Sequence, residues 1–114
     1  MRDIFEDRFL RVRQLQRDYI VHYLNKPDTD FRLSLEFLKQ CDTVSVDLET
    51  SNQQTVSYMQ FACRSKCYVF NMFRLGKNED FIDFLLEFFH NSKVQKVVFD
   101  KLEFLARINS FLGE

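Results

Sequence analysis

In the N-terminal part of the chain, apolar residues recur first at helical and then at strand spacing. Residues 3–17 place apolar side chains at mixed helical spacings among charges, which predicts an amphipathic helix. Residues 19–24 are β-branched and aromatic, so they predict either the end of that helix or a short strand, and the strand is favoured. Residues 28–30 supply N-cap side chains for a further helix, which runs to about Gln40.

Three successive segments in the middle of the chain have the alternation of β-strands. Residues 43–50 carry apolar side chains on one side and polar side chains on the other, namely Val44, Val46 and Leu48 against Ser45, Asp47 and Glu49. A polar turn at 51–54 leads to a second strand at 55–63, and a hairpin at 64–66 leads to a third strand at 68–73. Three successive strands of this kind predict an antiparallel meander.

The C-terminal part of the chain predicts helix, strand and helix. The helix at 78–90 has a stripe of buried residues, formed by Phe81, Phe84, Leu85 and Phe88. Residues 94–99 predict a short, fully buried strand, and Asp100 opens a last helix that Gly113 closes. The order of elements predicts a single α/β domain over 1–114, with a mixed sheet of the meander plus a further strand, flanked by helices.

Composition supports a globular domain that has almost no net charge. Hydrophobic residues make up 46% of the chain and 14 residues are Phe, which provides ample surface for a core. The formal net charge is −1, so there is no global positive field of the kind that attracts nucleic acid. One segment concentrates basic residues, Arg8, Arg11, Arg13 and Arg17. A solvated helix face is favoured for it over a phosphate-binding surface.

The cysteines and the N-terminus both indicate an intracellular protein, cytoplasmic or nuclear. Cys41, Cys63 and Cys67 follow no zinc-binding spacing and are odd in number, which predicts small, reduced and buried thiols. Acidic residues stand near the N-terminus, where a signal peptide needs an apolar core. No apolar run is long enough to cross a membrane, so we expect no membrane association.

Asp47 and Glu49 form the candidate site that the strand pattern offers. As residues i and i+2 of a strand they lie on one face, with Cα atoms roughly 6–7 Å apart. Both carboxylates could then reach one or two divalent metal ions, which activate water and stabilise the leaving oxygen of a phosphodiester. An Asp-x-Glu pair is by itself a weak motif, so on spacing alone a solvated strand end is favoured.

The order of elements around this pair resembles the ribonuclease D branch of the DEDD exonuclease superfamily, which includes the Werner-syndrome and Mut-7/Nibbler-type exonuclease domains. The first motif of that branch, hydrophobic-x-hydrophobic-D-x-E, is matched by Val44, Val46, Asp47 and Glu49. The two following strands of that branch are resembled by 56–61 and 68–72. The resemblance runs from about Tyr19 to the end of the chain. It implies a ribonuclease-H-like fold.

The resemblance also implies a 3′–5′ exonuclease that binds Mg²⁺ or Mn²⁺ and acts on single-stranded RNA or DNA. Its metal ligands and catalytic residues would be Asp47, Glu49 and Asp100. Asp100 is the carboxylate nearest the place of the second motif, where the branch has an Asp on the first turn of a helix after a strand. An alternative alignment on 102–105 puts Lys101 at that place. The third motif, a Tyr or His four residues before an Asp, has no place before Glu114.

Two alternatives follow from the missing third motif. The chain is expected to be catalytically incomplete, either as a fragment of a longer exonuclease or as a degenerate copy that is kept for binding. In the second case it would bind RNA or a protein partner, or form a homodimer through its Phe-rich surface. A third interpretation is a small α/β scaffold in which the Asp-x-Glu pair is incidental.

Other side chains offer weaker candidates. His22 and His90 have no catalytic partner at a recognisable spacing, so surface or helix-end roles are favoured. The Phe residues of the helix at 78–90 have the spacing of a core or docking face rather than of a base-stacking platform. Phe73 and Phe89 are expected to lie outside the core, where they could contribute to a partner surface.

Overall fold

The computed structural model describes residues 20–50 and 55–113. The helix predicted at 3–17, with its basic segment, and the turn predicted at 51–54 lie outside the described residues. The described elements follow one another in the order β1 (Ile20–Leu24), α2 (Thr29–Lys39), β2 (Thr43–Thr50), β3 (Val56–Cys63), β4 (Lys66–Asn71), α3 (Met72–Leu75), α4 (Glu79–His90), β5 (Gln95–Val97) and α5 (Lys101–Leu112). No described helix is long and apolar enough to cross a bilayer.

The helix boundaries follow from capping side chains that are visible in the sequence. Asp28, Asn78 and Asp100 each accept a hydrogen bond from the backbone N–H three residues on, which satisfies one of the unpaired donors of the first helical turn. At the other end of α5, Gly113 takes the left-handed conformation with φ 78°. The strand favoured at 19–24 is confirmed over its described part, Ile20–Leu24, and the three long helices beyond it are confirmed.

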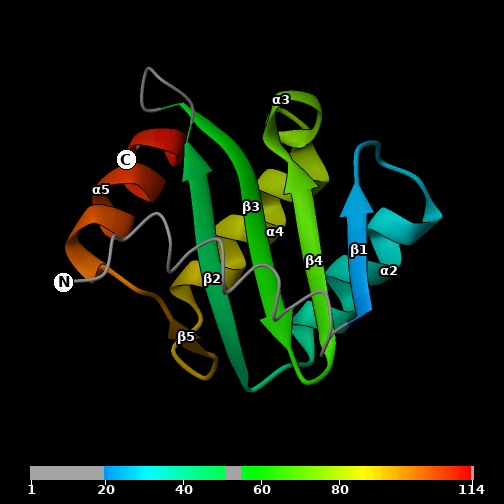
Figure 1. Cartoon of the computed structure of the whole chain (residues 1–114), viewed down its shortest axis with the longest axis horizontal. Coiled ribbons are helices and arrows are strands. Elements are labelled where there is room, and N and C mark those ends of the chain that lie inside the picture. The colour runs from blue at the N-terminus through cyan, green and yellow to red at the C-terminus, as the bar shows by residue number, and fades with distance from the viewer. Residues whose placement is uncertain (1–19, 51–54, 114) are drawn as a thin grey trace, which may run out of the picture.

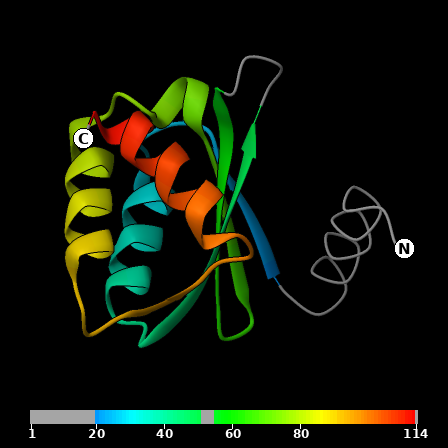
Figure 2. The ribbon, with the colours of Figure 1, turned by 90° about the vertical axis from the view of Figure 1, so that its left-hand side faces the viewer.

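The five strands form one mixed sheet in the order β1-β4-β3-β2-β5 (Figure 1). β2, β3 and β4 pair antiparallel, so the predicted meander is confirmed. β1 pairs parallel to β4 and β5 pairs parallel to β2, which places these two strands at the two edges. Figure 2 shows α2, α4 and α5 on one face of this sheet. The fold class is therefore α/β with a mixed sheet, as the sequence predicted.

The core between the sheet and the helices is built largely from Phe rings. Phe61 of β3 is fully buried and lies edge-on to Phe70, Phe84 and Phe88, with ring centroids 5.5, 6.0 and 5.4 Å away. The stripe predicted on α4 faces this core throughout its length. Phe89 also packs against the core, whereas Phe73 is 68% exposed, so the expectation that both lie outside is confirmed only for Phe73.

Two strand predictions need correction at their ends. The strand predicted at 68–73 ends at Asn71, whose side chain accepts a hydrogen bond from the Phe73 N–H and so begins the short helix α3. The strand predicted at 94–99 is shorter than predicted and is not fully buried. β5 has three residues and lies at a sheet edge, with Val97 48% and Phe99 65% exposed. Val94 just before β5 is buried, and Val98 just after it packs against the core.

Two of the three cysteines form a disulfide, whereas the sequence predicted three reduced thiols. Cys41, which follows α2, and Cys63, at the end of β3, are joined in a disulfide with their Cα atoms 6.6 Å apart. The prediction is wrong for this pair, because the fold brings together two residues that are 22 positions apart. Cys67 is free and buried as predicted, and burial raises the pKa of its thiol to about 11.

The substitution Phe61→Leu should lower the free energy of unfolding by about 1–2 kcal/mol, because it removes edge-to-face ring contacts and leaves unfilled space. Phe73→Leu is the matched control, and at an exposed position it should cost less than about 0.5 kcal/mol. Urea denaturation measures both values. Equal losses would contradict the placement of Phe61 in the core.

The substitution Cys63→Ala should lower the free energy of unfolding by about 3 kcal/mol in the absence of reductant, because it opens the loop that the disulfide closes. In dithiothreitol the wild type should lose the same increment, so the two proteins should converge. Cys67→Ala serves as the control and should respond to reductant as the wild type does. A wild-type protein whose stability is insensitive to dithiothreitol would contradict the pairing.

Candidate active site

The candidate site lies where β5 separates from β2. β5 pairs with β2 only at Thr43, Val44 and Ser45, and the chain then turns away towards the start of α5. The remaining part of β2 therefore has an edge that β5 does not cover. Figure 1 shows α5 beside this half of β2. Side chains at the first turns of α5 can thus meet side chains at the C-terminal half of β2.

β2 presents its carboxylates on the face opposite its buried side chains. Val46 and Leu48 are buried, and Asp47 and Glu49 are half-buried, as the strand alternation predicted. Asp47 Oδ1 accepts a hydrogen bond of 3.0 Å from the backbone N–H of Leu48, which fixes the orientation of the carboxylate. The β2–β3 register shifts between Glu49 and Thr50, where the strand is irregular. This irregularity lies directly beyond the carboxylate pair.

Asp100 stands at the first turn of α5 and caps it. Its Oδ1 accepts a hydrogen bond of 3.1 Å from the backbone N–H of Glu103. The helix N-terminus carries partial positive charge, which favours a carboxylate at this place. The same hydrogen bond orients the carboxylate through one of its two oxygens. Lys101 points elsewhere, because it lines a separate groove between α4 and α5.

A pocket of about 50 Å³ brings these elements together. Its lining comes from the C-terminal half of β2, the residues before α5 and the first turns of α5, and comprises Val46, Asp47, Leu48, Thr50, Phe99, Asp100, Glu103, Phe104 and Arg107. Asp47 and Asp100 therefore share one pocket although they are far apart in the sequence. Glu49 does not line it. Of the two residues considered for the second motif, Asp100 lines the same pocket as Asp47 and Lys101 does not.

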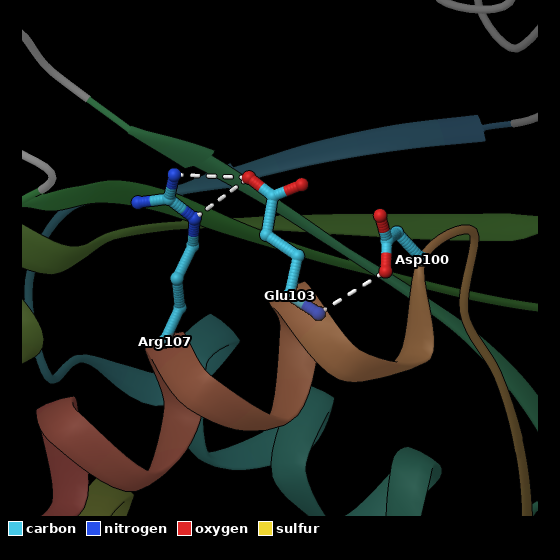
Figure 3. A network of polar contacts seen from close by, with 3 residues as sticks. All are labelled: Asp100, Glu103 and Arg107. Atoms are coloured by element: carbon cyan, nitrogen blue, oxygen red, sulfur yellow. Dashed lines mark hydrogen bonds and ion pairs between the residues drawn. The ribbon is translucent and has the colours of Figure 1, made fainter.

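Two further charged residues of the pocket were missed by the sequence analysis. Arg107 donates from Nε and Nη2 to Glu103 Oε1, at 3.1 and 2.9 Å. Figure 3 shows Asp100, Glu103 and Arg107 on the same side of α5. The sequence does carry a signal for the pair, since Glu and Arg at i and i+4 of a helix are neighbours. It carries no signal that this side of α5 faces β2.

Asp47 and Asp100 could contribute ligands to one hydrated divalent ion, but they do not form a complete metal site by themselves. Within 20–50 and 55–113, no three His, Cys, Asp or Glu side chains gather closely enough to hold a metal ion by themselves. Mg²⁺ is commonly bound through one or two carboxylates, with water and substrate phosphates as the remaining ligands. Asp47 and Asp100 supply that number of carboxylates. The pocket has room for an ion with a few water molecules.

The histidines have local structural partners. The ring of His22 stacks on Tyr68, with centroids 5.0 Å apart. His90 Nδ1 lies 2.7 Å from the Leu86 carbonyl oxygen, to which it donates at the end of α4. Neither histidine lines the pocket. These positions agree with the roles favoured from the sequence.

No model of a protein family and no curated protein matches the chain. Solved structures do match it. RNase D of Trypanosoma brucei matches with a TM-score of 0.72 at 14% identity, over 83% of this chain and 35% of that one. The EXO domain of Aedes aegypti Nibbler matches with a TM-score of 0.69 at 19% identity, over 82% of this chain and 44% of that one. The same Trypanosoma enzyme in complex with RNA U12 matches with a TM-score of 0.71 at 14% identity, over 88% of this chain and 36% of that one.

These likenesses establish the fold. The described residues have the fold of the matched RNase D and Nibbler structures, a mixed sheet of five strands with helices packed on it. The chain spans about a third to a half of the length of the three matched structures, 35%, 36% and 44%. At these identities the match extends to the arrangement of the elements and not to individual side chains.

Substitutions at Asp100 should show how much its capping hydrogen bond contributes to stability when no metal ion is bound. Asp100→Ala removes the acceptor for the Glu103 N–H and should lower the free energy of unfolding by about 1 kcal/mol. Asp100→Asn keeps a capping oxygen and should stay within about 0.3 kcal/mol of the wild type. Chemical denaturation in EDTA measures both. A similar loss for Asn and Ala would mean that the carboxylate charge, rather than the cap, stabilises α5.

Proposed function

We propose that this chain is a 3′–5′ exonuclease-like domain for processing nucleic acid, in which Asp47 and Asp100 bind Mg²⁺ or Mn²⁺. The observation that carries the proposal is the shared pocket. Asp47 comes from the central sheet and Asp100 from the cap of α5, and a chain with the fold of exonuclease domains places both at one small cavity. Glu49 lies two residues after Asp47 on the same face of β2. We propose it as a further metal ligand, because Asp47 and Glu49 together match the first motif of the ribonuclease D branch.

Backbone N–H groups of the chain would orient the two Asp side chains towards the ion. A bound divalent ion lowers the pKa of its water and balances the charge that develops on a phosphodiester. The Leu48 and Glu103 N–H groups hold one oxygen of each Asp in place, which leaves the other oxygen for the ion. Phe99 and Phe104 add apolar residues to the lining of the pocket.

Single-stranded RNA or DNA is the proposed substrate. The match to a solved complex of Trypanosoma brucei RNase D with RNA U12 supports this choice by analogy of fold. The net charge of −1 implies that binding depends on local contacts with the ion and the pocket rather than on long-range attraction. Affinity should therefore depend on the divalent ion.

A second candidate is a module of the same fold that binds without cleaving. It is favoured by apolar side chains exposed beside the pocket, since Phe99 and Leu102 are 65% and 81% exposed and Val97 lies next to them on β5. Large exposed apolar side chains gathered in one region are a common feature of protein interfaces. In this case the partner would be RNA, a protein or a second copy of the chain.

Mn²⁺ should stabilise the wild type and have little effect on Asp47→Asn. Binding to the native state alone raises the free energy of unfolding by about 2.7 kcal/mol when free Mn²⁺ is about a hundred times its Kd. Asp83→Asn, which removes an exposed carboxylate from α4, is the matched control and should respond to Mn²⁺ as the wild type does. Thermal denaturation with and without Mn²⁺ measures the effect. Equal stabilisation of wild type and Asp47→Asn would refute the metal site.

A second assay separates cleavage from binding. With Mn²⁺, a 5′-labelled single-stranded RNA should shorten stepwise from its 3′ end if the chain is an exonuclease, and Asp47→Asn should abolish the shortening. Retention of intact RNA, measured by a mobility shift, would support the non-cleaving module instead. A single-stranded DNA of the same sequence gives the preference between the two nucleic acids.

A further inference from the structure

A groove between α4 and α5 is separate from the pocket that Asp47 and Asp100 line, because the two share only Phe104. Figure 2 shows both helices on the same face of the sheet. The volume of the groove is about 410 Å³, which is within the range of small-ligand sites, roughly 300–1,000 Å³. Most of its lining is apolar, as in such sites, and comprises Phe89, Val98, Phe104, Leu105, Ile108 and Leu112. The groove therefore has the size and the lining of a ligand site.

The apolar surface of the groove extends along α5. Phe104, Ile108 and Leu112 are spaced four residues apart, so their side chains lie on one side of the helix. At a rise of about 1.5 Å per residue, the stretch from Lys101 to Leu112 is about 16 Å long. The ring of Phe104 contacts that of Phe89 on α4, with centroids 5.7 Å apart. An unbranched apolar chain could lie along this surface and displace water from it.

The positive charge of the groove is concentrated at the end where α4 finishes and α5 begins. Lys101 is the first residue of α5, and His90, the last residue of α4, lines the groove as well. The Lys96 ammonium donates to the carbonyl oxygen of Asn91, directly after α4, and so uses one of its three donors. Burial lowers the pKa of Lys96, because its charged form loses hydrating water. No described residue that lines the groove is acidic, so both lysines would stabilise an anion there.

We propose that this groove binds a free medium-chain fatty acid. The carboxylate would meet Lys96 and Lys101, and the alkyl chain would run along α5 towards Leu112. Charge complementarity favours an anionic head, since the groove has lysines and no acidic residue in its described lining. The concave shape favours a small ligand over a protein surface, because the most exposed apolar side chains of this region, Phe99 and Leu102, lie outside the lining. The site is independent of the metal ion proposed above.

Octanoate is the probe, and its binding is measured on the full chain by titration with two-dimensional NMR of the nitrogen-labelled protein. One octanoate should bind per chain, and the amide shifts should be largest along α5, around Leu105 and Ile108. Octanol has the same alkyl chain without the charge. It should bind about threefold to fivefold more weakly than octanoate, because it lacks the attraction to the lysines.

Two pairs of variants test the two ends of the groove. Lys101→Gln removes one cation and should weaken octanoate binding about threefold to fivefold, whereas Lys93→Gln removes an exposed lysine outside the groove and should have no effect. Leu105→Glu puts a carboxylate into the apolar part and should weaken binding at least about tenfold. Leu102→Glu changes the same helix outside the groove and should bind octanoate as the wild type does. Both leucines are exposed, at 41% and 81%, and thermal denaturation verifies that the variants are folded.

Several results would overturn the fatty-acid site. They include no binding of octanoate to the wild type, octanol binding as tight as octanoate binding, and equal binding of octanoate by the wild type and Leu105→Glu. A dimer in sedimentation that Leu105→Glu dissociates would assign the groove to a second copy of the chain instead. Binding of a synthetic amphipathic helix of Leu and Glu, or of phosphatidylglycerol vesicles, without binding of octanoate would assign the groove to a protein segment or to a membrane surface.

Discussion

β5 pairs with only the first three residues of β2, and the arrangement of the candidate site depends on this short pairing. A longer β5 would cover the edge of β2 as far as Asp47 and would carry the chain past it. Because β5 ends at Val97, the chain turns within three residues to Asp100, and α5 starts beside the uncovered edge. The pocket is the space that this turn leaves between strand and helix.

The rigidity of that arrangement comes from the Phe-rich core. Phe61 on β3 is paired in register with Val46 on β2, so the side chain that anchors the sheet to α4 lies directly beside the strand that carries Asp47. Phe89 contacts Phe104 of α5, with ring centroids 5.7 Å apart, and so connects α5 to α4. The two walls of the pocket are therefore attached to the same core.

The sequence was sufficient for most of the elements and for the antiparallel pairing of β2, β3 and β4. Strand alternation placed Asp47 and Glu49 on the face opposite Val46, and capping side chains located the starts of α2, α4 and α5. These features are local, because each depends on residues within a few positions of one another. The family resemblance, also a matter of local motifs and their order, is in agreement with the fold.

Tertiary structure alone decided which charged groups meet. No local pattern distinguishes Asp100 from Lys101 as the neighbour of Asp47, and none shows that Arg107 enters an acidic pocket. The pairing of Cys41 with Cys63 and the exposure of Val97 at a sheet edge were missed for the same reason. Each depends on contacts between segments far apart in the chain, whose closeness is set by how the sheet and helices pack and not by the periodicity of either segment.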